Sequence, residues 1–234
     1  MTSVPFPVVF ALFPGVTQLD FTGPAEVFAR LPGASLTLAS VEGGLLESES
    51  GITFARLKRF ADVSECALLC VPGGIGTTAA MEDAAFLEAV RRLAARATYV
   101  TSVCTGSLLL GAAGLLRGKR AACHWAWREL LGTFGALPDP ARVVREGNLF
   151  SGGGVTAGID MALTVMAEIA GPDFARGTQL AMEYAPEPPF AAGRPETAPA
   201  EILAAVRQRM QSLGATRIAA ARRAADALTV EAGV

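Results

Sequence analysis

Short apolar runs that end in Gly/Pro turns alternate with stretches of helical periodicity along most of this chain. The first run, Phe6–Phe13, stops at Pro14 and predicts a strand, and a helix is expected over Gly23–Leu31. Three later apolar runs also predict strands, and these are Ser35–Ser40, Ala67–Val71 and Thr98–Val103. The alternation is typical of a parallel sheet covered by helices on both faces.

Helical spacing is clearest in the segment Met81–Arg96. Its apolar residues recur at i, i+1, i+4, i+7 and i+8, which is the pattern of an amphipathic helix. The elements expected after it are a buried helix at Gly106–Leu116, a helix at Trp125–Gly132, a strand pair over Val143–Phe150 and a core helix at Gly158–Ile169. The fold class predicted is therefore α/β, with a flavodoxin-like doubly wound sheet.

The C-terminal part of the chain has a different character. Ala185–Glu201 holds five of the 14 prolines and predicts an extended arm rather than a regular element. Apolar residues at helical spacing follow the arm, and these are Ile202, Leu203, Val206, Met210 and Leu213. We therefore expect an α/β domain over residues 1–184, an arm over 185–201, and a helical tail over 202–234 that packs on the domain or on a second subunit.

The tail becomes rich in alanine and arginine past Gly214. Its basic residues Arg217, Arg222 and Arg223 suggest either a DNA-binding face or a solvated helix face. The chain carries 20 Lys+Arg against 22 Asp+Glu, a net charge of −2, which supplies no field for gripping phosphate backbones. We therefore favour the solvated face and expect no nucleic-acid partner.

Composition restricts the class of protein further. With 234 residues, 51% hydrophobic and 18% charged, the chain is long and apolar enough to bury a core. The longest strongly apolar stretch, Leu108–Leu116, is too short to span a bilayer, so no membrane partner is expected. The first basic residue is Arg30, which leaves no signal-like N-terminus. A cytoplasmic protein is expected.

Four cysteines and a single histidine limit the chemistry. A zinc site built mainly from histidine is excluded, and the spacing of Cys66, Cys70, Cys104 and Cys123 matches neither paired zinc knuckles nor a disulfide framework. Free thiols in a reducing compartment are the simplest interpretation. We expect neither a metal nor an organic cofactor.

Cys104 stands where an apolar strand turns directly into a helix, with Gly106 two residues later. This arrangement is similar to a nucleophile elbow with cysteine in place of serine. Backbone N–H groups at a helix N-terminus favour the thiolate. A buried, inert core cysteine is the alternative, and position alone does not decide between them.

Two other predicted strand ends carry candidate partners for Cys104. The loop after the strand Ala67–Val71 has a glycine pattern that begins at Gly74, nominally a dinucleotide fingerprint. The acidic residue that would confirm that fingerprint is missing from the end of the next strand, so we favour Gly74 as a backbone donor to an anionic intermediate. Asp20, between two apolar residues near a helix start, is either a helix cap or a proton donor and acceptor for the thiol. His124 is a further possible partner.

These loops together resemble the DJ-1/PfpI superfamily, and within it most the isonitrile hydratase branch. The stretches that carry the resemblance are QLDFTGP (18–24), PGG (72–74), YVTSVCTGS (99–107), HWA (124–126), GGG (152–154), TAGID (156–160) and EYAP (183–186). They extend over roughly four fifths of the chain. The protease-like members have a histidine directly after the cysteine, where this chain has Thr105, so peptide hydrolysis by an adjacent Cys–His pair is not expected.

The resemblance implies Cys104 as nucleophile, Asp20 as acid and base, and Thr105 as a neighbour whose N–H or hydroxyl touches the substrate. Gly74 corresponds to the backbone donor of the superfamily. Other residues expected at the substrate are Ile75, Gly153 and Val155, with Leu19 and Phe21 as further apolar candidates. A homodimer is also implied, as is a small isonitrile substrate that is hydrated to an N-substituted formamide through a thioimidate, without a cofactor.

Two alternatives stay open at this point, and a third is disfavoured. A glyoxalase or deglycase of the same superfamily would use Cys104 on small carbonyl compounds. A redox sensor would oxidise Cys104 to a sulfinic acid and would have no turnover. A transcription regulator would need a second domain, and the tail after Ile202 is too short for a complete helix-turn-helix module.

Overall fold

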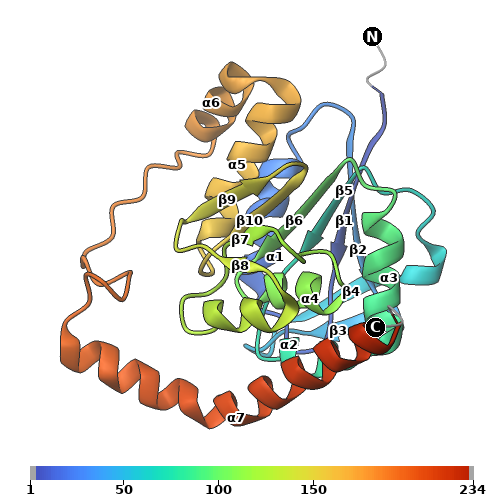
Figure 1. The fold of residues 1–234 in the computed structure, drawn as a ribbon. Coiled ribbons are helices and arrows are strands. Elements are labelled where there is room, and N and C mark those ends of the chain that lie inside the picture. The colour runs from blue at the N-terminus through green and yellow to red at the C-terminus, as the bar shows by residue number, and fades with distance from the viewer. Residues whose placement is uncertain (1–3, 232–234) are drawn as a thin grey trace.

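The computed structural model describes residues 4–231, apart from the side chain of Leu213. Its centre is an eight-stranded sheet with the order β3-β4-β2-β1-β5-β6-β10-β9 (Figure 1). The strands between the two edge strands pair in parallel, whereas β3 and β9 run antiparallel to their neighbours. The strands are β1 Phe6–Ala11, β2 Ala34–Ser40, β3 Gly44–Glu47, β4 Thr53–Arg59, β5 Leu68–Val71, β6 Tyr99–Val103, β9 Val143–Glu146 and β10 Leu149–Gly152.

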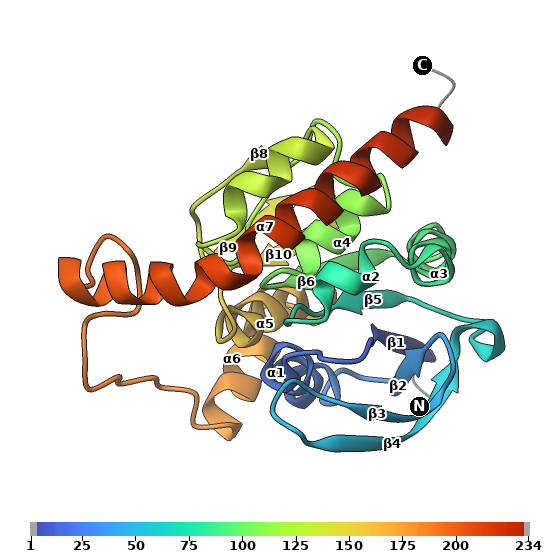
Figure 2. The ribbon, with the colours of Figure 1, turned by 90° about the horizontal axis from the view of Figure 1, so that it is seen from below.

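Helices cover both faces of this sheet, as Figure 2 shows from below. On one face α1 packs against α5, and α6 lies beside α5. On the other face α4 packs on β5 and β6 and also contacts α2, α3 and α7. The helices are α1 Gln18–Phe28, α2 Thr77–Ala80, α3 Ala84–Ala94, α4 Gly106–Ala112, α5 Ala157–Ala170, α6 Pro172–Ala181 and α7 Ala200–Glu231. The predicted doubly wound α/β fold is confirmed.

The core lies on both sides of the central strands because most residues of these strands are apolar and buried. β5 is fully buried, and the largest buried side chains include Phe10, Phe28 and Phe150. The two polar residues buried in β6 have partners. Thr101 donates to the carbonyl of Leu69 at 3.0 Å, and the hydroxyl of Ser102 lies 2.9 Å from that of Ser107. Burying them therefore leaves no hydroxyl unsatisfied.

Several predicted boundaries are wrong for identifiable reasons. α1 begins at Gln18, ahead of the predicted Gly23, because the helix accepts Pro24 in its interior instead of in its first turn. The edge hairpin β3–β4 was not predicted, because most of its side chains are exposed and it shows no apolar run. α4 ends at Ala112, short of the predicted Leu116, just before Gly114 with φ 79°.

The segment after α4 also departs from expectation. The helix predicted at Trp125–Gly132 is instead a 3₁₀ segment, η2, over Arg128–Phe134, which ends at Gly135 with φ 70°. The short strands β7 Arg120–Ala121 and β8 Leu137–Pro138 pair in parallel, and a single 3₁₀ turn, η1, spans Phe60–Asp62. α6 was not predicted either. It begins with Pro172 in its first turn, directly after Gly171 with φ 89°.

The tail forms a single helix, α7, which continues through Gly214. No helix or strand connects α6 to α7. The arm between them runs outside the body in both ribbon views (Figures 1 and 2), and its residues 193–196 line a pocket together with His124, Trp125 and Arg128. The C-terminal half of α7 lies across α2, α4 and η2 and buries Ala220, Ala221 and Ala224. In the first half, Ile202 is 50% exposed. The packing of the tail is therefore concentrated after Gly214.

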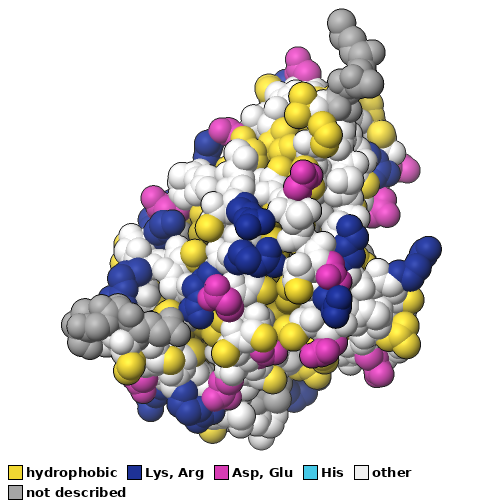
Figure 3. Space-filling model, turned by 90° about the vertical axis from the view of Figure 1, so that its right-hand side faces the viewer, with side chains coloured by type: hydrophobic (Ala, Val, Ile, Leu, Met, Phe, Trp, Pro, Cys, Tyr) yellow, Lys and Arg dark blue, Asp and Glu magenta, His cyan; other side chains and the backbone are white. Residues whose placement is uncertain are grey.

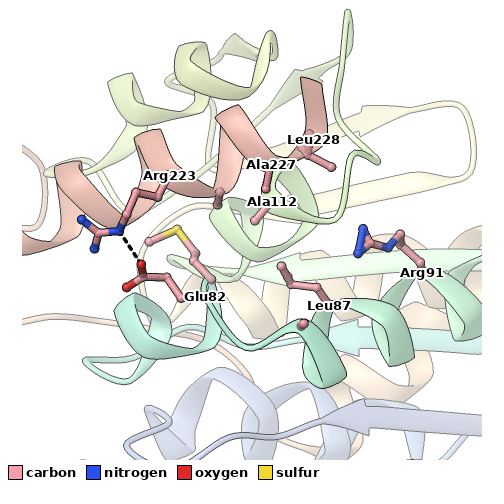
Figure 4. A pocket seen from close by; sticks show the side chains of 10 residues that line it. Glu82, Leu87, Arg91, Ala112, Arg223, Ala227 and Leu228 are labelled. Carbon is pink, nitrogen blue, oxygen red and sulfur yellow. Dashed lines mark hydrogen bonds and ion pairs between the residues drawn. The ribbon is translucent and has the colours of Figure 1, made fainter. Parts of the chain in front are cut away.

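The interpretation of the tail arginines as a solvated face is wrong for Arg217. Arg217 is only 3% exposed, whereas Arg222 and Arg223 lie on the surface. Arg223 pairs with Glu82 at 2.6 Å beside a cavity of about 240 Å³ between α3 and α7 (Figure 4). Arg217 faces the domain because it shares a helical stripe with the buried alanines.

The outer surface carries interspersed charges on the face drawn in Figure 3, where acidic and basic side chains alternate. Among the described residues, no helix has the length and apolarity needed to cross a membrane. Neither observation changes the expectation that the chemistry of this chain lies at the ends of its strands.

Candidate functional site

Three loops meet at the carboxyl edge of the sheet. The first follows β1, the second follows β5 and the third follows β6. β1 lies between β2 and β5, so the connections that leave β1 and β5 diverge there, and such a crevice is where ligands bind in doubly wound folds. The register pairs Val71 of β5 with Ser102 of β6, which brings both strand ends to the same level. The N–H of Thr17 donates to the carbonyl of Gly73 at 2.9 Å and joins the first loop to the second.

Cys104 follows β6 directly and has φ 60°, a left-handed conformation that is strained for a residue with a side chain. Its N–H donates to the carbonyl of Gly152 at 3.0 Å, which holds the turn against β10. Gly106 makes the turn possible, since a Cβ there would lie 2.0 Å from the carbonyl oxygen of Val71. This backbone is the elbow that the sequence predicted, and it presents the thiol at the carboxyl edge of the sheet.

Asp20 lies in the first turn of α1 and is completely buried. Its Oδ2 accepts the N–H of Gly73 at 2.9 Å, and its carboxyl lies close enough to the thiol of Cys104 for each group to shift the pKa of the other. Its Oδ1 is buried without a partner among the described protein atoms. The helix-cap interpretation of Asp20 is therefore wrong, because the carboxyl turns away from its own helix and toward the cysteine.

The pKa of each member of this pair is shifted upward. Burial raises the pKa of Asp20 to about 7, against the opposing effects of the Gly73 N–H and the Cys104 thiol. Burial and the neighbouring Asp20 raise the pKa of Cys104 well above that of a free thiol, and the N–H of Thr105 only partly opposes this. The expected helix N-terminal effect is present but is outweighed, so the resting cysteine is a thiol.

The raised pKa of Cys104 does not by itself set it apart from the other cysteines. All four are free and buried, and burial raises the pKa of Cys66, Cys70 and Cys123 to about 12. What distinguishes Cys104 is its strained backbone, its contact with a carboxyl and its place on a pocket. The function of this thiol depends on geometry and on a proton acceptor at contact distance.

Gly73 has no side chain because Asp20 and Thr105 occupy the space beside it. A Cβ at Gly73 would lie 2.4 Å from Oγ1 of Thr105 and 3.1 Å from Oδ2 of Asp20. Gly74 has φ 144°, a conformation that residues with side chains rarely adopt. The pair of glycines therefore lets the backbone of the second loop approach both the acid and the elbow.

Thr105 and Gly74 are bonded to each other. The N–H of Gly74 donates to Oγ1 of Thr105 at 3.0 Å, and this hydroxyl lies 2.8 Å from that of Thr77. The N–H of Thr105 donates to the sulfur of Cys104. The N–H groups of Gly74 and Thr105 thus both lie beside Cys104, with the Gly74 N–H engaged by a hydroxyl that a ligand oxygen would have to replace.

A cavity of about 210 Å³ opens above Cys104. It is lined by Thr17, Glu49, Gly74, Ile75, Cys104, Thr105, His124, Trp127, Val155, Met210 and Arg217. Ile75 and Val155 are therefore placed on the pocket as predicted candidates. Leu19, Phe21 and Gly153 do not line it: Phe21 packs in the core against Phe54, and the N–H of Gly153 donates to the carbonyl of Arg142 at 2.9 Å.

His124 lines this pocket, a question that the sequence left open. Burial and the charge of Arg217 lower the pKa of His124, which favours the neutral imidazole. Its Nδ1 accepts the N–H of Ala126 at 3.3 Å. A neutral histidine on the wall can shape the pocket, while the carboxyl beside the thiol belongs to Asp20.

Sequence reasoning missed five of the lining residues, which are Thr17, Glu49, Trp127, Met210 and Arg217. Thr17 and Glu49 are bonded to each other at 2.7 Å at the rim. Arg217 was detectable in principle, since it shares a helical stripe with Ala220, Ala221 and Ala224. Helical spacing placed Met210 on the apolar face of the tail but not at the site, and Trp127 carried no comparable signal. Among the described residues there is no group of three or more potential metal ligands.

Comparison with known proteins agrees with this geometry. The sequence model of the DJ-1/PfpI family matches residues 7–168, which include both Asp20 and Cys104. The chain therefore belongs to the DJ-1/PfpI family. A protein from Pseudomonas putida named isonitrile hydratase is 52% identical over 200 residues, which cover 86% of this chain and 88% of that protein.

Solved structures show the same fold. The crystal structure of a ThiJ/PfpI family protein from Pseudomonas syringae superimposes with a TM-score of 0.90 and 39% identity, covering 94% of this chain and 92% of that chain. The crystal structure of DJ-1beta from Drosophila melanogaster has a TM-score of 0.70 and 21% identity, and covers 78% of this chain and 100% of that one. The second likeness is one of fold alone.

We expect Gly73→Ala to destabilise the protein by about 1–3 kcal/mol, because its Cβ must displace Thr105 or Asp20. Gly177→Ala is the matched control, since a Cβ there meets nothing within 4 Å and alanine is the better helix former. Urea denaturation measures both variants. Equal stability of Gly73→Ala and wild type would show that the close approach is not required.

The raised pKa of Asp20 predicts how stability depends on pH. A carboxyl whose pKa rises from 3.8 to about 7 on folding binds more protons in the native state, so its contribution to stability falls as pH rises between these values. Asp20→Asn removes this loss, which is about 4 kcal/mol at most. When denaturation is measured from pH 4 to 8, the free energy of unfolding of the variant should increase relative to that of wild type as the pH rises. A constant difference would contradict the raised pKa.

Proposed function

We propose that this chain is an isonitrile hydratase, a cofactor-independent hydro-lyase that converts isonitriles into N-substituted formamides. The observation that carries the proposal is the thiol of Cys104 beside the carboxyl of Asp20, buried together beneath a small cavity. An isonitrile, R–N≡C, needs a nucleophile and a proton at the same carbon, and a thiol with a carboxyl supplies both. The 52% identity to the Pseudomonas putida protein of that name supports this substrate class.

The first step adds the thiol across the terminal carbon. With one proton shared between the pair, Asp20 receives the proton of Cys104 as the sulfur attacks and delivers it to the carbon. The new S–C and C–H bonds give a thioimidate, R–N=CH–S–Cys, with no atom lost. Because Oδ2 of Asp20 accepts the N–H of Gly73, the unpartnered Oδ1 is the oxygen available to carry the proton from sulfur to carbon.

The second step hydrolyses the thioimidate. Asp20, again ionised, removes a proton from water as the water oxygen attacks the former isonitrile carbon, and it passes this proton to the imine nitrogen. The resulting tetrahedral carbon holds OH, NH–R, H and S. Breaking its C–S bond returns the electron pair to sulfur, and Asp20 takes up the hydroxyl proton as the formamide carbonyl forms, which gives R–NH–CHO and leaves one proton on the pair. The N–H groups of Gly74 and Thr105 are the proposed donors to the oxygen in this step.

The walls of the cavity suit an uncharged R group. Ile75, Val155, Trp127 and Met210 present apolar surface, and about 210 Å³ accommodates a small alkyl or aryl substituent. The redox-sensor alternative is disfavoured because a buried thiol with a raised pKa is slow to oxidise. The glyoxalase alternative is a direct competitor for the same thiol, and product analysis separates the two.

We also propose a homodimer and a cytoplasmic location. The first half of α7 supports the dimer, since Ile202 is half exposed and Leu203, Val206 and Met210 are only partly buried on the same helix. A second copy of the chain could cover that face. The four free cysteines support a reducing compartment.

Cys104→Ala should reduce formamide production from an aryl isonitrile on the order of 10³-fold or more, because no other group can form the thioimidate. Cys66→Ala is the control, as this buried cysteine lies before β5, at the opposite end of that strand from the site. Products are identified by chromatography and mass spectrometry, with methylglyoxal loss measured in parallel. Turnover retained in Cys104→Ala, or loss of methylglyoxal without formamide, would overturn the proposal.

The pH profile follows from the pair. Below about pH 7 Asp20 and Cys104 both hold protons, and the reactive state with one shared proton grows as Asp20 ionises. We expect kcat/KM to rise with pH through a midpoint near 7 and to stay level into the alkaline range, because the second proton leaves well above the usual thiol pKa. In Asp20→Asn, kcat/KM should fall about 10²–10⁴-fold and should not rise with pH through a midpoint near 7. A profile that falls as pH rises from 6 to 8 would contradict the shared proton.

A further inference from the structure

Arg217 is buried although it belongs to the C-terminal helix, outside the region that forms the sheet and the elbow. Its Nη2 donates to the carbonyls of Gly74 at 3.0 Å and Ile75 at 3.2 Å. Its Nε donates to Oγ1 of Thr78 at 3.0 Å, and its guanidinium lies over the ring of Trp127, 4.7 Å from the centroid. These contacts join α7 to the second loop of the site.

Arg217 forms no ion pair with a described residue, although Glu49 lines the same pocket. Among the described residues, no carboxylate lies within 4.0 Å of this guanidinium, and its partners are carbonyls, a hydroxyl and an aromatic ring. A buried cation without a counter-charge is costly to maintain. Such a cost indicates that an anion forms close to Arg217 at some point in the working cycle.

The cavity shows where that anion forms. Arg217 and Cys104 line the same pocket, with Trp127 and His124 between the helix and the elbow. With Nε and Nη2 engaged, Nη1 is the nitrogen for which the described residues provide no hydrogen bond. The ionisable groups that raise the pKa of Arg217, in order of their effect, are Cys104, Cys123 and Glu49. Of these, only Cys104 is both on the pocket and chemically placed to cycle between thiol and thiolate.

We propose that Arg217 is a positioning residue of this site: its guanidinium fixes the carbonyls of Gly74 and Ile75 and supplies the positive charge that stabilises the thiolate of Cys104. The inference rests on the proposed function. In the hydrolysis step the C–S bond breaks with its electron pair on sulfur, and the anion appears in the field of Arg217. By holding the Gly74 carbonyl, Arg217 also orients the adjoining peptide, whose N–H faces Thr105.

The test measures the thiolate directly. Alkylation of Cys104 by iodoacetamide is followed against pH by mass spectrometry of its peptide, in wild type, Arg217→Gln and Arg217→Lys. We expect Arg217→Gln to raise the midpoint of alkylation by about one pH unit, which makes alkylation about tenfold slower at a given pH below it. Arg217→Lys keeps the charge but not the two-carbonyl contact, so its midpoint should stay near wild type while kcat falls.

Arg222→Gln is the matched control, because Arg222 lies on the same helix but is exposed and does not line the pocket. It should leave both the alkylation midpoint and kcat unchanged. A folded Arg217→Gln variant with the alkylation profile of wild type overturns the proposal. So does a rise in KM with no change in kcat or alkylation, which would make Arg217 a substrate-binding residue. If Arg217→Gln does not fold, an unchanged kcat in Arg217→Lys overturns it.

The alkylation readout separates this inference from the function on which it rests. If wild type forms no formamide but the midpoint still moves in Arg217→Gln, the proposed function fails and the electrostatic role of Arg217 stands. If formamide is formed and the midpoint does not move, the function stands and the role of Arg217 fails.

Discussion

The burial of one carboxyl group organises the whole site. Asp20 is withdrawn from water in the first turn of α1, and its compensating contacts are the N–H of Gly73 and the thiol of Cys104. Placing these groups together requires β1, β5 and β6 to end at one level, the second loop to lack a side chain at Gly73, and the elbow to adopt a left-handed backbone at Cys104. Each of these local features is explained by the same constraint.

The electrostatic consequence is a proton that belongs to two groups. Burial raises the pKa of Asp20 into the neutral range. The pair of Asp20 and Cys104 therefore changes its charge by one near pH 7, a pH at which ordinary carboxyl groups and thiols do not titrate. A site of this kind can give and take a proton at a single carbon without a metal. Arg217 extends it, since a fixed cation on the wall compensates the negative charge when it resides on sulfur.

The sequence was sufficient to predict the central parallel strands and the strand-to-helix turn at Cys104, whereas the chemistry expected at that edge stays a prediction. Apolar runs located β1, β2, β5 and β6, because strands buried on both faces consist largely of consecutive apolar residues. The turn from strand to helix singled out Cys104. Edge elements such as β3–β4 escaped, since exposed strands need no such run. Gly153 shows the limit of motif matching: a glycine next to the site in the chain lies off the pocket in space.

Arg217 shows why the rest could not be predicted. Its contacts with Gly74 and Thr78 join residues about 140 positions apart, and no local pattern encodes the docking of one helix over a distant loop. Net charge favoured a solvated face for the tail arginines, an argument that holds for Arg222 and fails for a residue buried on a stripe of alanines. Tertiary placement, not composition, decides which arginine becomes part of the site.

The central claim is that Asp20 is a neutral acid below neutral pH and ionises near pH 7. Infrared difference spectroscopy measures this directly, because a protonated buried carboxyl has a carbonyl stretching band that the carboxylate lacks. The account predicts a band at pH 5.5 that disappears with a midpoint near 7 and is missing from Asp20→Asn. A band absent at pH 5.5, or one that titrates near the ordinary aspartate value, would contradict it.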